Sequence, residues 1–408
     1  MFFLCLLYFY AKKKGCYIKI RAKMITAYLK PTNFCNVGCS HCYLPESVRA
    51  DKFKMDDETL HKVMRFLKEM KEQGKHEQIF LIWHGGEPLI LGHKYFEHAG
   101  EIIDQYFTKD EIMESVQTSL IPYKKEFNNL VKKRWNGYLG SSMDFNSRLL
   151  KGSADEYQKL WMSKVEIARE ENIYIIPGIT PNKIDCENAE FIYNWFKERH
   201  FDVWNIDRYS NVGGDLPEFS TNREHSKFLC DLFDLCIKDI KENNYAPLIK
   251  PVVAAIGGIL YDQPGDRWGG SCQSDFVVIN PNGSLNNCPD KDSFEESYGS
   301  LHNGFSSFKN SPMRKKWIRI QQVGHRIDEC STCENSNWCK SGCPITGNAC
   351  SINGVQDDCS GFKIYINHVR KFIDESEENK EMAIKLFQGQ FVDGLRKSEL
   401  NKVMPVSS

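Results

Sequence analysis

Three cysteines stand close together near the start of the chain, in the run Cys35-Asn-Val-Gly-Cys39-Ser-His-Cys42-Tyr43. Three thiolates at this spacing can hold three irons of a cubane cluster and leave the fourth iron without a protein ligand, whereas clusters that only transfer electrons take four cysteines. Because an open iron can chelate a small molecule, the spacing favours a catalytic 4Fe–4S cluster. The alternatives are a zinc knuckle and free cysteines in a core.

A second candidate is the run Trp-His-Gly-Gly-Glu-Pro at residues 83–88. Paired glycines let the backbone approach another group closely, and a carboxylate can accept hydrogen bonds from a cation. The run directly follows the apolar segment Gln78–Trp83, which has the pattern of a strand. Since α/β barrels build their sites at the carboxyl ends of strands, this position favours a ligand contact.

The elements that must position these residues follow a regular alternation of strand-like and helix-like segments. The predicted strands are Met24–Lys30, Gln78–Trp83, Ile112–Gln117, Gly137–Ser142, Ile173–Ile179 and Val203–Arg208. The predicted helices are Asp57–Lys71, Lys94–Tyr106, Lys124–Lys133, Ala154–Glu171, Asn188–Arg199 and Glu224–Lys241. Such alternation predicts βαβ units around a parallel sheet. Six units fall short of the eight in a closed barrel, so the fold class is α/β with a partial (β/α)6 TIM-like barrel.

The cysteine loop resembles the Cys-x-x-x-Cys-x-x-Cys loop of the radical SAM superfamily, and residues 83–88 resemble that family's Gly-Gly-Glu-Pro motif. The resemblance implies that the open iron binds S-adenosylmethionine (SAM) and that electron transfer releases a 5′-deoxyadenosyl radical. The slot before the third cysteine is often aromatic in the family and is His41 here. A Ser-x-Asp motif after the fourth strand points to Ser142. The candidate cofactor-binding residues are Tyr43, Gly85, Gly86, Glu87, Pro88, Ser142 and Arg148.

A second field of cysteines lies toward the C-terminus, in a segment rich in Gly, Asn and Ser where helical periodicity mostly disappears after residue 257. Its spacing resembles the seven-cysteine SPASM extension, which binds auxiliary 4Fe–4S clusters in radical SAM enzymes that modify peptides. The resemblance implies one complete auxiliary cluster on Cys330, Cys333, Cys339 and Cys359. It implies three irons of another on Cys272, Cys288 and Cys343. On spacing alone, a zinc ribbon over Cys330–Cys343 stays open.

Three further residues are candidates for catalysis. Asp290 stands two residues after Cys288; some sulfatase-maturing relatives have an aspartate directly after that cysteine as a proton acceptor, whereas Pro289 intervenes here. His84 and Arg208 are candidates because each ends a predicted strand. A solvated side chain is the alternative for each.

Composition and the chain ends complete the expectations. The 408 residues carry 53 Lys+Arg against 54 Asp+Glu, which argues against binding nucleic acid by bulk charge. Sixteen cysteines favour metal or catalytic chemistry in a reducing cytoplasm. The apolar run at residues 1–10 is shorter than the roughly 20 residues that cross a bilayer, so no membrane partner is expected. We expect residues 1–23 to be a non-native extension, 24–246 the barrel, 247–372 the loop-rich iron–sulfur (SPASM) domain, and 373–408 a C-terminal helix and tail.

The sequence therefore predicts a radical SAM/SPASM peptide maturase with SAM and three 4Fe–4S clusters. Its expected partners are a ribosomally made precursor peptide and an external electron donor of flavodoxin or ferredoxin type. The expected product is a carbon–carbon (cyclophane) or thioether crosslink. An anaerobic sulfatase-maturing enzyme, which oxidises Cys or Ser to formylglycine, is the nearest alternative. A zinc or electron-transfer iron–sulfur protein is the alternative of another class.

Overall fold

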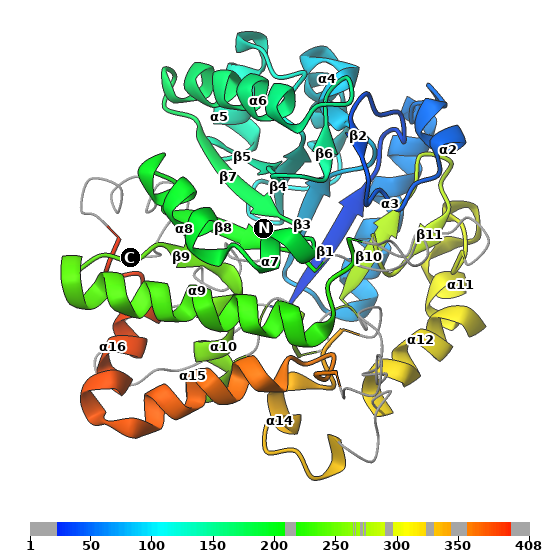
Figure 1. Cartoon of the computed structure of the whole chain (residues 1–408). Coiled ribbons are helices and arrows are strands. Elements are labelled where there is room, and N and C mark those ends of the chain that lie inside the picture. Colours follow the sequence, from blue (N-terminus) through cyan, green and yellow to red (C-terminus); the bar gives the residue numbers. More distant parts are fainter. Residues whose placement is uncertain are drawn as a thin grey trace. The chain divides into compact units, whose positions relative to one another are not determined.

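The computed structural model describes residues 23–208, 218–263, 265, 267–269, 272, 275–289, 297–323, 330–343 and 357–392. The chain divides into two compact units. The first, here the cysteine-loop unit, comprises Ile20–Ile175 and Cys272–Arg319. The second, here the helical unit, comprises Ile176–Ser271 and Ile320–Ser408. Each is described separately below, with the element labels of Figure 1.

The cysteine-loop unit is built on a largely parallel sheet. The strands are β1 (Met24–Leu29), β3 (Gln78–Trp83), β4 (Ile112–Thr118) and β5 (Tyr138–Ser142) in that order, with β10 (Phe276–Ile279) on the other side of β1 and β11 (Leu285–Asn286) at its edge. Figure 1 shows β1 between β3 and β10. Only the β10–β11 pair among these is antiparallel. The parallel arrangement brings the carboxyl ends of β1, β3, β4 and β5 to one edge, where both sequence motifs begin.

Buried apolar residues explain why these segments form a sheet covered by helices. Ile25, Ala27 and Leu29 of β1 are fully buried, and so are all residues of β3 from Ile79 to Trp83. Burial on both faces is typical of parallel strands under helices. The helical and short strand elements of this unit are α2 (Glu46–Ala50), α3 (Asp57–Gly74), η1 (Pro88–Leu91), α4 (His93–Ile103), η2 (Lys125–Phe127), α5 (Asn128–Arg134), α6 (Ala154–Arg169), η4 (Leu301–Asn303), α11 (Gly304–Asn310), most of α12 (Pro312–Val323), and the short strands β2 (Gly38–Cys39) and β6 (Arg148–Leu149).

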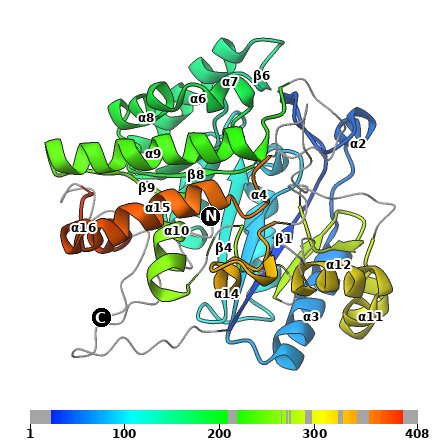
Figure 2. The same cartoon turned by 60° about the horizontal axis from the view of Figure 1, so that its bottom comes forward.

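Helix α3 illustrates how the local sequence sets an element. Its N-terminus is capped by Asp56, whose carboxylate accepts from the Thr59 backbone N–H at 2.9 Å. The helix ends where Lys75 takes a left-handed conformation, with φ 53°. Its buried side packs against α11, where the Phe66 ring meets Phe305 and Phe308 edge-on. Figure 2 shows α11 next to α3.

The helical unit contains parallel strands and long helices. Strand β8 (Val203–Ile206) pairs in parallel with β7 (Tyr174–Ile179) and with β9 (Leu248–Ile249). The helices are α7 (Lys183–Cys186), α8 (Ala189–Glu198), α9 (Asn222–Asn243), α10 (Lys250–Tyr261), α14 (Ser336–Cys339), α15 (Lys363–Glu375) and α16 (Glu377–Phe387). Figures 1 and 2 both show α15 running alongside α9. The Phe233 ring of α9 meets Phe372 and His368 of α15 there.

The α/β class with a largely parallel sheet confirms the fold prediction, and each of the six predicted strands is present within a few residues. Two details differ. Helical periodicity mostly disappears after residue 257, but the structure has α11 and α12 there, as well as β10; β10 is an apolar run of only four residues and so gives a weak pattern. The charged helical pattern over residues 364–387 comprises two helices, because the extended backbone of Ser376 ends α15 and its hydroxyl caps α16.

No helix in the described ranges is both long enough and apolar enough to cross a bilayer.

Candidate functional site

The cysteine loop is held in place by a short antiparallel pairing with the chain after β5. Strand β2 pairs with β6, so that Cys39 lies opposite Arg148. The Ser40 backbone N–H donates to the Ser147 carbonyl at 2.9 Å, and the Cys35 N–H donates to the Arg49 carbonyl at 3.1 Å. Two chain segments therefore fix the loop.

The three cysteines of this loop are half-buried, and Cys39 and Cys42 lie close enough to Cys35 to affect its pKa. Burial raises the pKa of Cys35 to about 12, and the negative charges of Glu87, Cys39 and Cys42 add to this. Burial also raises the pKa of Cys39, with a contribution from Cys42. Thiolates in this position need a compensating cation. Among the described residues, no three His, Cys, Asp or Glu side chains converge on the position of a single ion. A cubane shares its thiolate ligands among several irons, so the three thiols fit such a group.

The two glycines of the 83–88 run lie against the backbone that precedes the cysteine loop. A Cβ on Gly86 would lie 2.2 Å from the Asn33 carbonyl oxygen, and one on Gly85, whose φ is +128°, would lie 2.2 Å from that of Thr32. The Gly86 N–H donates to the Thr32 carbonyl at 3.1 Å. The close approach predicted for these glycines is thus made to the backbone that leads into Cys35.

The Glu87 carboxylate is buried and accepts hydrogen bonds from its own chain. The Thr118 hydroxyl donates to it at 2.6 Å, the Ser119 backbone N–H at 2.6 Å and the Leu89 N–H at 3.0 Å. Burial raises the pKa of this carboxyl, and the hydrogen bonds oppose the rise. Glu87 therefore links the ends of β3 and β4. The next residue, Pro88, is buried and begins η1.

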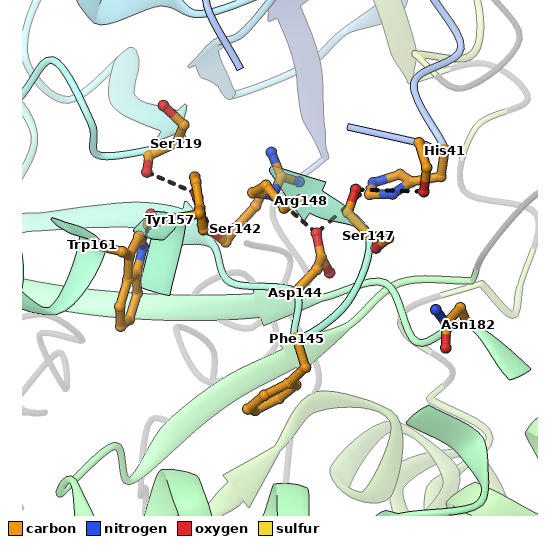
Figure 3. A network of polar contacts seen from close by, with 12 residues as sticks. His41, Ser119, Ser142, Asp144, Phe145, Ser147, Arg148, Tyr157, Trp161 and Asn182 are labelled. Atoms are coloured by element: carbon orange, nitrogen blue, oxygen red, sulfur yellow. Dashed lines mark hydrogen bonds and ion pairs between the residues drawn. The ribbon is translucent and has the colours of Figure 1, made fainter. Parts of the chain in front are cut away.

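A buried polar network lies on the other side of the cysteine loop (Figure 3). The Arg148 Nε donates to the Asp144 carboxylate at 2.9 Å, and His41 Nε2 lies 3.8 Å from the same carboxylate. Burial lowers the pKa of His41 to about 4, so its ring is neutral near pH 7. The guanidinium of Arg148 also lies 5.8 Å from the centre of the Tyr157 ring. Arg148, a candidate cofactor-binding residue, is therefore paired with Asp144 in this structure.

Ser142 and Tyr43 lie next to this network and the cysteine loop. The Ser142 hydroxyl accepts from Gln117 Nε2 at 3.0 Å, and its carbonyl accepts from the Tyr157 hydroxyl at 2.8 Å. The Tyr43 ring lies under the ammonium of Lys30, which is 4.7 Å from the ring centre. Lys30 directly follows β1 and is fully buried.

The three catalytic candidates have separate positions. The His84 ring meets Tyr28 edge-on, with ring centres 5.3 Å apart. Arg208 lies in the helical unit, where its guanidinium is buried, donates to the Ser220 hydroxyl at 2.8 Å and lies near the Phe219 ring. Burial lowers the pKa of Arg208 to about 10. Asp290 lies outside the described residues.

A second group of thiols forms within the helical unit. Burial raises the pKa of Cys339 to about 12, and negative charge on Cys359, Cys333 and Cys330 contributes to the rise. A Cβ on Gly361 would lie 2.6 Å from Cys339 Sγ and 3.6 Å from Cys359 Sγ. These are the four cysteines to which the SPASM resemblance assigned one auxiliary cluster. A group of thiols around the buried Cys339 fits the cationic iron–sulfur core of a cluster, as in the first loop.

Two acidic residues fix the Cys359 end of this group. The Asp358 carboxylate accepts from the backbone N–H of Cys359 at 2.7 Å and from the Ser226 hydroxyl at 2.6 Å. Asp357 accepts from the N–H groups of Asn222 and Arg223 in the first turn of α9. The start of α9 and the Cys359 loop are thereby joined.

The remaining three candidate ligands lie in different units. Cys272 and Cys288 belong to the cysteine-loop unit, where the buried Asn287 donates from Nδ2 to the Cys272 carbonyl at 2.9 Å. Cys343 belongs to the helical unit, and Arg267 donates to its sulfur at 3.8 Å.

Sequence patterns did not single out Lys30, Asp144 or Arg267. Lys30 and Asp144 each had a signal, because the first is a lysine directly before the cysteine loop and the second completes the Ser-x-Asp motif. Arg267 had none, since nothing in the sequence links a loop arginine to a cysteine 76 positions later.

Comparisons with known proteins found a matching family model and several similar proteins. The model of the radical SAM superfamily matches residues 29–185. A serine-type anaerobic sulfatase-maturating enzyme of Bacteroides thetaiotaomicron is 24% identical over 388 residues, which cover 86% of this chain and 91% of that protein. Among solved structures, native anSMEcpe with bound AdoMet and Kp18Cys peptide superposes with a TM-score of 0.70 at 17% identity, covering 89% of this chain and 99% of that one. Streptococcus suis SuiB bound to precursor peptide SuiA gives 0.56 at 14% identity, covering 80% and 73%.

Proposed function

Because the chain belongs to the radical SAM superfamily and is an enzyme of the SPASM maturase type, we propose that it modifies a ribosomally made precursor peptide by forming a carbon–carbon or thioether crosslink. The family uses SAM and a 4Fe–4S cluster, which together supply a radical that abstracts hydrogen. The candidate ligands of this cluster are Cys35, Cys39 and Cys42.

One observation carries the proposal beyond the superfamily. The thiols of Cys330, Cys333 and Cys359 lie close enough to Cys339 for negative charge on them to raise its pKa, and this group lies in the helical unit, outside the segment 29–185 that matches the radical SAM model. A second site for a cluster suits a reaction that removes hydrogen from substrate and must then dispose of an electron. A crosslink requires this disposal, since joining two side chains removes two hydrogens. We infer that auxiliary clusters on these cysteines would accept that electron. An external flavodoxin or ferredoxin would supply the electron that reduces the first cluster.

The residues of the cysteine-loop unit have defined tasks in this proposal. Gly85 and Gly86 hold the backbone before Cys35, and Arg148 stands opposite Cys39. Ser142 ends β5 and Tyr43 directly follows Cys42; both are candidate contacts for SAM. Lys30, with its ammonium over the Tyr43 ring, supplies buried positive charge beside the loop.

A peptide substrate is supported by structural neighbours that hold peptides, among them anSMEcpe and SuiB. The same comparisons favour a second candidate function, since the relative from Bacteroides thetaiotaomicron matures sulfatases. Formylglycine formation is therefore the alternative. The Asp directly after the second SPASM cysteine, found in some sulfatase maturases, is replaced here by Pro289, which favours the crosslinking function.

Incubation of the reduced enzyme with SAM and each class of peptide, followed by mass spectrometry, separates the two functions. A precursor peptide that loses two hydrogens and resists fragmentation between two residues supports crosslinking. An aldehyde on one Cys or Ser of a sulfatase peptide, trapped by a hydrazine, supports the alternative. Fragmentation is required because both reactions on serine remove two hydrogens.

A further inference from the structure

Arg267 is an arginine that the proposed function leaves without a role, although it contacts a candidate cluster ligand. Its Nη1 donates to Cys343 Sγ at 3.8 Å, and its Nη2 lies 3.7 Å from the Asp207 carboxylate. The Arg267 side chain is 12% exposed. One end of the guanidinium thus contacts a sulfur, and the other end lies near a carboxylate.

The neighbours of Arg267 in the chain hold it against the second cysteine group. The Trp268 Nε1 donates to the Gly361 carbonyl at 2.9 Å, and the Gly269 N–H donates to the Cys339 carbonyl at 3.2 Å. The Trp268 ring is buried against Trp338. Consecutive residues are therefore anchored to Cys343, to the loop after Cys359 and to Cys339, which leaves Arg267 little freedom to turn away.

Charged groups of both signs lie around Arg267. Lys250 and Arg208 are buried in the same unit; Lys250 acts on Asp207 together with Arg267, and Arg208 is close enough to Arg267 for each charge to affect the other. The nearby His225 adds no charge, because burial, Arg208 and Arg267 lower its pKa well below the ordinary value. Negative charge comes from Asp207, Asp357 and Glu224. Three cations are thus matched by three carboxylates, so the case for Arg267 rests on its contact with the Cys343 sulfur.

Iron–sulfur clusters are anions once their thiolate ligands are counted, and hydrogen bonds to their sulfurs are among the factors that set their reduction potentials. Reduction adds one more negative charge. A cation that donates to a ligand sulfur stabilises the reduced form more than the oxidised form, and so raises the potential.

We propose that Arg267 is a positioning residue that raises the reduction potential of the auxiliary cluster to which Cys343 contributes. This inference rests on the proposed function, in which an auxiliary cluster accepts an electron from the modified substrate. A higher potential makes that acceptance more favourable. Arg267 acts through Cys343 and is not assigned a contact with substrate.

The test uses the full chain with Cys35→Ala, Cys39→Ala and Cys42→Ala, so that the remaining clusters are auxiliary. After anaerobic reconstitution, this parent is expected to bind about eight irons in two clusters. Electron paramagnetic resonance during a potentiometric titration gives the midpoint of each cluster. Arg267→Gln, which removes the charge, and Arg267→Lys, which keeps it, are added to the parent. Arg223→Gln, an exposed arginine of the same unit, is the matched control.

Arg267→Gln is expected to lower one midpoint at an unchanged iron content, Arg267→Lys to lower it less, and Arg223→Gln to change neither. Equal midpoints in the parent and in a fully loaded Arg267→Gln chain overturn the inference alone. If Arg267→Gln loses a cluster, Arg267→Lys decides: a lowered midpoint supports the inference, and the parent's midpoint overturns it. Fewer than about eight irons in the parent, where Arg267 is intact, contradicts the auxiliary clusters of the proposed function itself.

Discussion

Cys39 and Arg148 lie opposite each other in an antiparallel pair, 109 positions apart along the chain. The middle cysteine of the loop is thus positioned by the segment that follows β5. Arg148 in turn pairs with Asp144, the aspartate of the Ser-x-Asp motif, at 2.9 Å. The order of the cysteine loop therefore depends on a buried ion pair in a different part of the sequence.

Arg148→Gln is expected to destabilise the cysteine-loop unit, because it leaves the buried Asp144 carboxylate without its cation. Breaking a buried pair from one side costs about 3–5 kcal/mol, which denaturant unfolding of the apo chain measures. The double variant Arg148→Gln, Asp144→Asn removes both charges and should recover part of the loss. A double variant as unstable as the sum of the two single ones would contradict a direct coupling between the residues.

Gly86→Ala is expected to reduce the iron bound by the first cluster. The added Cβ would lie 2.2 Å from the Asn33 carbonyl oxygen, so the backbone that leads to Cys35 must move. Gly178→Ala is the control, because its Cβ would meet only Asn205 Cβ, at an ordinary 3.8 Å. The measurement is iron per chain after anaerobic reconstitution, together with formation of 5′-deoxyadenosine. Equal iron and equal cleavage of SAM in the two variants would show that the loop tolerates the shift.

Cys359→Ala and Cys330→Ala are each expected to lose one auxiliary cluster, which is about four of about twelve irons. The first cluster stays in place, so reductive cleavage of SAM to 5′-deoxyadenosine continues while peptide modification falls. Cys236→Ala is the control, because that thiol is fully buried in α9. The measurement is the content of iron and acid-labile sulfide per chain in each variant. Zinc without sulfide in the wild-type chain would instead favour the zinc ribbon.

Asp239 gives a prediction about pH. Burial opposes its ionisation, but hydrogen bonds from Lys197, Asn243 and Tyr193 outweigh burial and lower the pKa of Asp239 below its ordinary value. Because the folded pKa is the lower one, the carboxylate contributes stability above the unfolded pKa of about 3.9, and this contribution disappears as the pH falls below it. Asp239→Asn should therefore cost about 1–3 kcal/mol at pH 7.

Unfolding by urea at pH 7 and at pH 3 tests this, and the difference between wild type and Asp239→Asn should shrink at the lower pH. Asp234→Asn is the matched control, since Asp234 lies in the same helix and pairs at its surface with His368. A difference that is the same at both values of pH would contradict the role of the Asp239 carboxylate.

The sequence alone predicted the strands and helices of the α/β fold well, because each carries its own periodicity. It missed β10, whose four apolar residues are too short to show a period, although β10 borders β1 on the side away from β3. It also joined α15 and α16, since Ser376 does not break the charged pattern between them. Pairing between strands that are distant in the chain cannot be predicted from local periodicity.

What the sequence by itself determined is the chemistry: three cysteines at the spacing of an open cluster, a Gly-Gly-Glu-Pro run after a strand, and a second field of thiols. Ligand type and spacing are local properties, so they can be recognised from the sequence alone. Only the tertiary structure decided that Gly86 approaches the backbone of Asn33, that Arg148 pairs with Asp144, and that Arg267 donates to Cys343. These contacts depend on where buried charges find partners, and burial arises only when distant segments pack together.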